Sequence, residues 1–141
     1  MPELRNVIVF TIGAVRYAVE LRWVREVVSL GFVTVVPTAP PAIGGVCNLH
    51  GTILPVLDVG AVLGGASGPP PRQGDGALVL EAEGLVCALR VDQVDHVASL
   101  QETAGSVIDS GGRTLPLLEP TRLVRSALEQ VGGTGEAGAR E

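Results

Sequence analysis

The sequence predicts a mostly β protein built from small barrels with a C-terminal helix. Valine occurs in short clusters, which favours strands because β-branched side chains pack well on a pleated sheet. Tight turns containing glycine separate these clusters and leave about nine or ten short strands, a pattern typical of small barrels. Strands do not alternate with long helical patterns, so a doubly wound α/β fold is disfavoured.

Length and composition limit the fold further. The chain has 141 residues, which suits one domain or two small subdomains that share a core. Apolar residues make up 46% and aromatic residues only 3%, so the core must consist of Val, Leu, Ile and Ala. No apolar run approaches the roughly 18 residues of a membrane span, and the first residues lack the pattern of an export signal. We therefore expect a soluble, cytoplasmic protein that does not insert into a membrane.

Charge and cysteine content exclude several functional classes. The formal charge of −5 argues against nucleic-acid binding, which needs a clustered basic face. All 10 cationic residues are arginines, so chemistry that requires a lysine amine is excluded. Cys47 and Cys87 lie in apolar, strand-like runs and are expected to be buried free thiols. Neither they nor the two distant histidines have metal-ligand spacing, so no metal or other cofactor is expected.

The first third of the chain predicts a hairpin, a helical turn and a further strand. Residues 7–12 and 15–19 are β-forming and flank a Gly-Ala turn. The apolar residues between Leu21 and Val27 have helix-like spacing, so a short helical turn is expected there. Residues 33–36 predict a short strand that ends at the proline-rich connector 37–41.

Residues 42–58 form the most informative stretch, with two apolar runs around an Asn-Leu-His-Gly corner. Gly51 can adopt a positive φ at a turn, and Ile53 to Leu57 predicts a strand. This strand contains Pro55, which is tolerated at a sheet edge or a bulge because no ladder N–H is then lost. Gly45 is most simply a turn glycine.

The second half predicts a short helix, a loop, a hairpin and a final strand with a helix. Residues 59–63 favour a helix, 64–76 a mobile loop, and 77–81 with 85–91 a hairpin around Glu83-Gly84. Weaker strands are expected at 94–100 and around Val107, followed by a strand at 113–118. Residues 120–131 have the apolar stripe of a helix, and 132–141 are expected to be a disordered tail.

Over roughly residues 5 to 130 the chain resembles the CheW-like family of bacterial chemosensory adaptors. The order and spacing of six segments carry the resemblance: Val9-Phe10, Tyr17-Ala18-Val19, Val24-Arg25-Glu26-Val27-Val28, Val36-Pro37, residues 43–58, and Leu89-Arg90-Val91-Asp92-Gln93-Val94. The resemblance implies a CheW-like domain at 5–131, made of two interleaved, SH3-like, five-stranded β-barrels packed together.

The resemblance also implies a non-enzymatic role. A member of this family is expected to bridge the cytoplasmic tip of a chemoreceptor and the regulatory domain of a CheA-type histidine kinase. Because that kinase domain has the same fold, adaptor and kinase can alternate in rings at membrane-associated receptor arrays. The composition agrees with this role but does not establish it.

One departure from the family pattern concerns His50. The family usually has Asn-Leu-Arg-Gly where this chain has Asn48-Leu49-His50-Gly51, and that arginine is expected to pair with the glutamate matching Glu26. An arginine binds a carboxylate with two hydrogen bonds and a permanent charge, whereas a histidine is shorter and mostly neutral at pH 7. We therefore expect a looser Glu26–His50 contact that is sensitive to mild acid and that alters partner choice.

The candidate residues for binding partners or supporting an interface are Trp23, Glu26, Val28, Val36, Ile43, Asn48, His50 and Gly51. Each also has a simpler interpretation. Glu26 can be a solvated residue, Trp23 can cap the core instead of anchoring a partner, and the apolar residues can belong to the core instead of a receptor groove.

Three other readings stay open at this stage. The chain can be a specialised paralogue that binds receptors without full kinase coupling or that serves a non-flagellar pathway. It can also be a response-regulator phosphatase, for which Glu129-Gln130 is the only adjacent Glu-Gln pair. Asp92 and Asp95 can suggest a cation site but are more simply turn or surface residues, and His96 is expected to be exposed.

Overall fold

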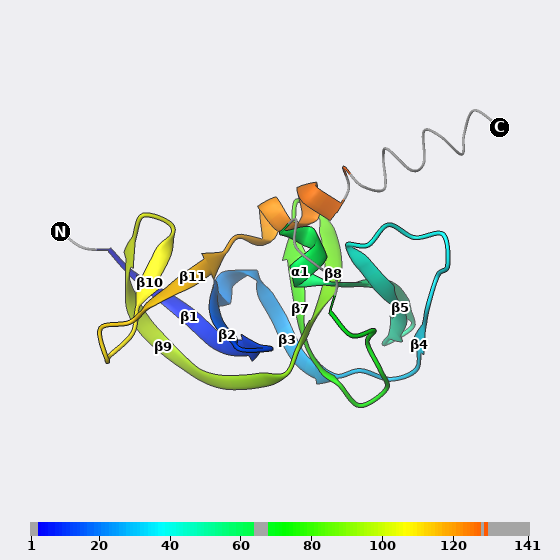
Figure 1. The fold of residues 1–141 in the computed structure, drawn as a ribbon, viewed down its shortest axis with the longest axis horizontal. Helices are drawn as coiled ribbons and strands as arrows, with labels where there is room; N and C mark the ends of the chain where they lie inside the picture. Colours follow the sequence, from blue (N-terminus) through cyan, green and yellow to red (C-terminus); the bar gives the residue numbers. More distant parts are fainter. Residues whose placement is uncertain (1–2, 64–67, 128, 130–141) are drawn as a thin grey trace.

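The computed structural model describes residues 3–63, 68–127 and 129, and it consists mainly of strands (Figure 1). In chain order the elements are β1 (Glu3–Ile12), β2 (Val15–Glu20), the 3-10 turn η1 (Leu21–Trp23), β3 (Val24–Ser29), β4 (Val33–Thr34), β5 (Ile43–Leu49), β6 (Thr52–Leu57), α1 (Val59–Val62), β7 (Gly76–Ala82), β8 (Leu85–Val91), β9 (Gln93–Thr103), β10 (Ser106–Ile108) and β11 (Thr114–Leu118). Residues 120–127 form a C-terminal helix.

The strands form two units, a barrel and a sheet. The chain begins in the barrel, builds the whole sheet, and then returns to complete the barrel. The first unit is a closed barrel of order β1-β2-β11-β10-β9, and the second is a six-stranded sheet of order β3-β7-β8-β6-β5-β4. The chain builds two of the five barrel strands, β1 and β2, crosses to the sheet for β3–β8, and returns to the barrel with β9–β11, so the units are interleaved (Figure 1). The expected fold class is confirmed, because the protein is mostly β with a C-terminal helix and one unit is a closed five-stranded barrel. The second unit differs from the five-stranded barrel that the resemblance implies, since it is a six-stranded sheet and not a closed barrel.

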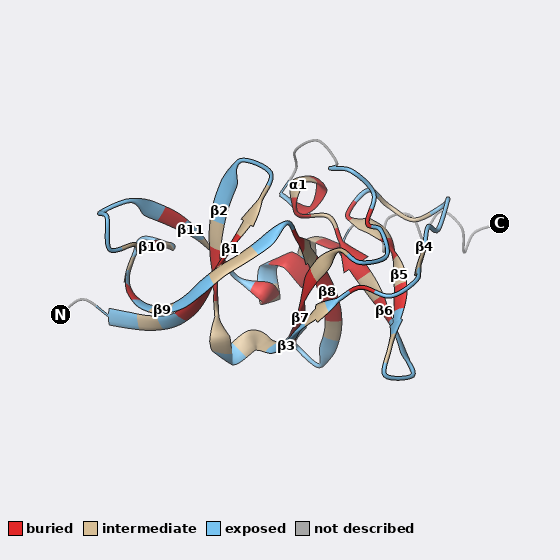
Figure 2. Ribbon diagram, turned by 90° about the horizontal axis from the view of Figure 1, so that it is seen from below, coloured by how far each residue is buried: buried red, intermediate tan, exposed pale blue. Residues whose placement is uncertain are grey.

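A single apolar cluster joins the two units. This junction cluster contains Ile8 and Phe10 from the barrel, Leu78 and Leu89 from the sheet, and side chains from both helices. Figure 2 shows the buried residues concentrated where the units meet. Each unit also has a smaller apolar cluster of its own, one inside the sheet and one inside the barrel. Because α1 and the C-terminal helix both pack on the junction cluster, they cover the seam between barrel and sheet.

Local sequence signals explain most elements. Glu83 and Gly84 both have positive φ, as a tight hairpin between β7 and β8 requires. Asp58 caps α1, because its side chain accepts a hydrogen bond from the Ala61 N–H at 3.1 Å. These elements confirm the corresponding predictions, as do the hairpin of β1 and β2 and the strands β9, β10 and β11.

Two expectations for the first third of the chain are wrong in extent. The helical turn covers only η1, and Val24–Ser29 is strand β3, which pairs with β7. Its burial alternates with a period of two because the inward side chains pack on the sheet core, so tertiary pairing overrides the helix-like spacing. The strand expected at 33–36 is limited to Val33–Thr34, since only these residues pair with β5.

Pro55 and Gly45 also differ from expectation. Strand β6 lies between β8 and β5, so Pro55 is not on a sheet edge. It is tolerated because the ladder with β8 begins only at the next residue, Val56. Gly45 lies within β5 and not in a turn, at a register shift where β4 approaches closely. A Cβ there would lie 2.8 Å from Val33 Cγ1.

Both cysteines are free and buried, as predicted. Burial raises the pKa of Cys87 to about 11 and also raises the pKa of Cys47, so neither thiol is activated. Among the described residues, no helix has the length and apolar character needed to cross a bilayer. The expected disordered tail at 132–141, the helix end at 130–131 and part of the 64–76 loop, residues 64–67, lie outside the described residues.

Candidate functional site

The Asn-Leu-His-Gly corner is a two-residue hairpin between β5 and β6. Leu49 pairs with Thr52, and this leaves His50 and Gly51 as the loop. Their φ values are 51° and 86°, and positive φ at both positions is typical of the type I′ turn that suits a twisted hairpin. The Asn48 side chain accepts the Gly51 N–H at 3.0 Å and stabilises the turn. The positive φ expected at Gly51 is confirmed, and His50 shares it.

His50, in the turn between β5 and β6, contacts Glu26 on strand β3. Its Nε2 lies 3.0 Å from Glu26 Oε1, with the histidine side chain 75% exposed and the glutamate 39% exposed. The hairpin tip therefore reaches strand β3, although the two strands are far apart in the sheet order. An exposed pair of this kind contributes little to global stability, but it ties the corner to β3. The expected contact is present, while its role in binding stays a prediction.

A shallow pocket of about 160 Å³ lies beside this contact. Its rim carries Arg25, Glu26 and His50, and its floor carries Leu54 and Val79. Arg25 Nε in turn lies 3.4 Å from Glu81 Oε2. The rim is therefore polar and the floor apolar, an arrangement that suits a protein side chain with an apolar body and a polar end.

An exposed row of side chains crosses the outer face of the sheet next to the corner. Ile53 pairs with Asn48, and Phe32 directly precedes Val33, which pairs with Cys47. Because the neighbouring Cys47 is buried in the sheet core, Asn48 and Ile53 face outward. Phe32 is 76% exposed and Ile53 is 62% exposed. We call Phe32, Asn48 and Ile53 the outer row.

The other predicted site residues do not gather with the outer row. Val28 packs against the core cluster inside the sheet, whereas Ile43 packs against the junction cluster. Val36 is exposed in the segment after β4. Trp23 is half-buried against the junction cluster, and the Arg22 guanidinium lies 4.7 Å from its ring centroid. The structure thus favours the core-cap interpretation of Trp23 and does not gather these residues in one groove.

Sequence reasoning missed Phe32 and Ile53. The exposed phenylalanine is one of two in the chain and follows Gly31, which hinted at a loop position. The relation between Phe32 and Ile53, however, depends on the register of three strands. That register cannot be read from local patterns, because shifting a strand by one residue reverses the face of every side chain.

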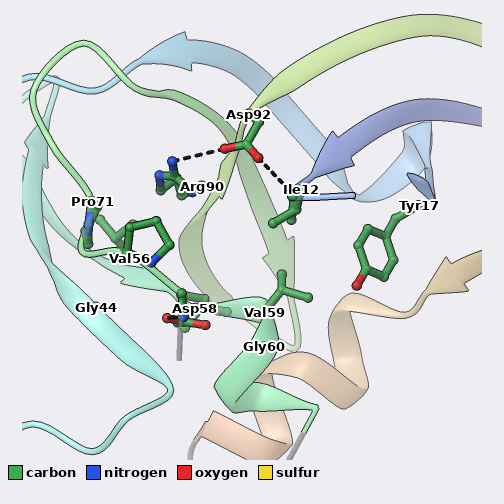
Figure 3. A pocket seen from close by; sticks show the side chains of 14 residues that line it. Ile12, Tyr17, Gly44, Val56, Asp58, Val59, Gly60, Pro71, Arg90 and Asp92 are labelled. Carbon is green, nitrogen blue, oxygen red and sulfur yellow. Dashed lines mark hydrogen bonds and ion pairs between the residues drawn. The ribbon is translucent and has the colours of Figure 1, made fainter. Parts of the chain in front are cut away.

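A second hollow, of about 320 Å³, lies at the junction of the two units (Figure 3). Its wall includes Tyr17, Asp58, Arg90 and Asp92. Asp92 accepts the Gly13 N–H and lies 3.0 Å from Arg90 Nη2, so it links the β1–β2 turn to the end of β8.

The alternative of a cation site at Asp92 and Asp95 finds no support. Asp92 is already engaged by Gly13 and Arg90, and Asp95 accepts the Thr11 hydroxyl at 2.9 Å and lies 3.5 Å from Arg16 Nε. In the part of the chain that the structure describes, no group of three or more His, Cys, Asp or Glu side chains could hold a metal. His96 is exposed on β9, as predicted.

Comparison with known proteins identifies the family. The profile of the CheW-like domain matches residues 6–128. The chain belongs to the CheW-like family. The chemotaxis protein CheW of Rhizobium meliloti (strain 1021) is 31% identical over 98 residues, which cover 70% of this chain and 63% of that protein. The chain therefore spans under two thirds of that relative's length.

Two further CheW-like proteins extend the comparison. A probable chemotaxis protein CheW of Rhizobium etli is 28% identical over 126 residues, covering 89% of this chain and 72% of the relative. The crystal structure of the scaffolding protein TtCheW from Thermoanaerobacter tengcongensis matches with a TM-score of 0.69 and 24% identity, covering 87% of this chain and 92% of that one. At this identity the structural match establishes the fold.

Proposed function

We propose that this chain is a non-enzymatic cytoplasmic adaptor that couples chemoreceptors to a CheA-type histidine kinase. The observation that carries the proposal is the CheW-like domain match over residues 6–128. Further support comes from two relatives that are named chemotaxis proteins and from a structural neighbour described as a scaffolding protein. Signalling then depends on how the adaptor positions its partners, and affinity is multiplied by repeated contacts in an array.

We further propose that the kinase regulatory domain docks on the outer row. Phe32 and Ile53 expose large apolar side chains beside one amide, Asn48, which can donate and accept hydrogen bonds. The Glu26–His50 contact holds the hairpin that carries Asn48 and so supports this surface. A receptor tip would then bind elsewhere, which leaves the adaptor free to hold both partners at once.

One observation favours the paralogue alternative within the same class. His50 makes a single contact with Glu26 and is largely exposed, where the family arginine could form two parallel hydrogen bonds. A looser corner would weaken kinase coupling while sparing receptor binding. The phosphatase alternative gains nothing, because Glu129 is exposed at the end of the described helix and Gln130 lies outside the described residues.

Co-sedimentation with receptor-tip particles, with and without the CheA-type kinase of the same organism, tests the proposal. A coupling adaptor pellets with the particles and increases both kinase incorporation and kinase autophosphorylation. A paralogue pellets but leaves the kinase in the supernatant. Failure to pellet in either mixture would refute the proposed function, although the fold would be unaffected.

A further inference from the structure

The backbone immediately before Phe32 is clamped by a neighbouring turn. Leu30 donates its N–H to the Asp75 carbonyl at 2.7 Å, and its own carbonyl accepts the Gly74 N–H at 2.8 Å. The Ser29 hydroxyl adds a hydrogen bond to the Gly74 carbonyl at 3.2 Å. The Leu30 side chain is buried in the core cluster of the sheet. Leu30 is therefore fixed by its side chain and by both of its backbone polar groups.

The clamping turn, residues 72–75, is itself held by one carboxylate. Asp75 Oδ2 accepts the Arg72 N–H and the Arg90 Nε–H, each at 2.9 Å. Arg90 belongs to β8 and lies 3.0 Å from Asp92 through Nη2. Both members of the Asp75–Arg90 pair are only partly exposed, so this ion pair is less screened than the most exposed arginine pairs, such as Arg122–Glu119. The turn is thereby tied to a central strand of the sheet.

Electrostatics keep this pair charged. Burial acts to raise the pKa of Asp75, but hydrogen bonds from Arg90 and from the Arg72 backbone outweigh it and leave that pKa lowered. The pKa of Arg90 is correspondingly raised, because its bonds to Asp75 and Asp92 outweigh the desolvation that lowers it.

Only two residues separate Leu30 from Val33, the next residue whose backbone is held by strand pairing. Val33 pairs with Cys47 in β5, so Gly31 and Phe32 bridge the distance from Leu30 to β4. A Cβ built at Gly31 would have no neighbour within 4 Å, so packing does not restrain the bridge at that point. The position of the Phe32 ring therefore depends on the anchors at its two ends.

We propose that Asp75, held by Arg90, is a positioning residue for the outer row, because it fixes the turn that clamps Leu30 and thereby presents Phe32 to a partner. The inference rests on the proposed docking of the kinase regulatory domain on the outer row. Asp75 itself does not need to touch the partner. Its effect on binding passes through the backbone at Leu30 and the placement of the Phe32 side chain.

A double-mutant cycle tests this route with the full chain and the purified regulatory domain of the CheA-type kinase. We expect Phe32→Ala to weaken binding at least about tenfold and Asp75→Ala about fivefold. The double variant should bind no more weakly than Phe32→Ala alone, since both changes act through the same ring. If Asp75→Ala weakens binding equally with and without Phe32, the positioning role is wrong.

Asp109 offers a matched control. Its Oδ1 accepts the Gly111 and Arg113 N–H groups at 2.9 Å each, so it stabilises a turn as Asp75 does, but in the closed barrel. Asp109→Ala should leave the affinity for the kinase domain unchanged. An equal loss of affinity in Asp109→Ala would mean that any weakened turn impairs binding, and it would overturn the proposal.

Amide hydrogen exchange separates failure of this inference from failure of the docking proposal. Asp75→Ala should increase exchange at the Leu30 and Gly74 amides by at least about tenfold and leave the β1–β9 amides unchanged. If Phe32→Ala binds the kinase domain normally, the docking surface is wrong, while the exchange result still decides whether Asp75 holds the backbone. Unchanged exchange at Leu30 would refute the clamp itself.

Discussion

At the scale of single residues, the clearest prediction for partner binding concerns His50. Its contact with Glu26 joins the hairpin tip to β3 through one nitrogen at 3.0 Å. We expect His50→Arg to strengthen binding of the kinase regulatory domain about twofold to tenfold, because a guanidinium can form two charged hydrogen bonds with Glu26.

Titration calorimetry measures the affinity. His96→Arg is a matched control, since His96 is also exposed but lies on β9 in the closed barrel. It should leave the affinity unchanged. Equal behaviour of His50→Arg and the wild-type chain would show that the corner does not influence docking.

We expect Asp75 to contribute to the pH dependence of the free energy of unfolding at acidic pH. Its lowered pKa means that the folded state prefers the ionised carboxylate, so the pair with Arg90 stabilises the fold at pH values above the ordinary carboxyl pKa. That stabilisation is lost as the pH falls through the lowered pKa of the folded state. Asp75→Asn should lower the melting temperature at pH 7, and the difference from wild type should shrink at more acidic pH. Thermal unfolding between pH 2 and 7 measures it; a constant difference would contradict the assignment.

At the scale of elements, the attachment of β4 depends on Gly45. Strand β4 pairs through only Val33 and Thr34, and a Cβ at Gly45 would lie 2.8 Å from Val33 Cγ1 and 2.9 Å from the Thr34 carbonyl. Gly45→Ala should therefore displace β4 and lower the free energy of unfolding by about 1–3 kcal/mol. Denaturant unfolding measures the loss.

Gly31→Ala is the control for Gly45→Ala. Neither glycine has a positive φ, but a Cβ at Gly31 would meet nothing within 4 Å. The Gly31 variant should be as stable as wild type, or slightly more stable because alanine restricts the unfolded chain. A loss of stability equal to that of Gly45→Ala would mean that close packing at Gly45 is not the cause.

The elements that the sequence predicts correctly are those whose own residues determine their geometry. Hairpins with Gly-containing turns were predicted because the turn residues themselves determine the geometry, as at Glu83-Gly84. The sequence does not determine strand β3, because Val24, Val27 and Val28 fit both a helical and a strand spacing, and only pairing with β7 decides between them. The Glu26–His50 contact followed from family resemblance, whereas the outer row required the register of β4, β5 and β6.

At the scale of the whole molecule, the barrel and the sheet share the junction cluster, so we expect them to unfold as one cooperative unit. Leu123 on the C-terminal helix is buried in this cluster together with Phe10 from the barrel and Leu78 from the sheet. Leu123→Ala should lower the free energy of unfolding by about 2–5 kcal/mol, because it removes apolar contacts and leaves a cavity. Since the cluster is shared, both units should lose stability together in one transition.

Hydrogen exchange measured at individual amides shows whether the barrel and the sheet are destabilised together or separately. Amides in the β1–β9 pair of the barrel and in the β5–β6 pair of the sheet should lose protection by a similar factor in Leu123→Ala. Leu63→Ala removes an exposed leucine next to α1 and should leave both sets unchanged. Loss of protection in the sheet alone would mean that the two units unfold independently. A jointly stable pair is what an adaptor needs, because a fixed relation between barrel and sheet lets a shift at one bound partner reach the other.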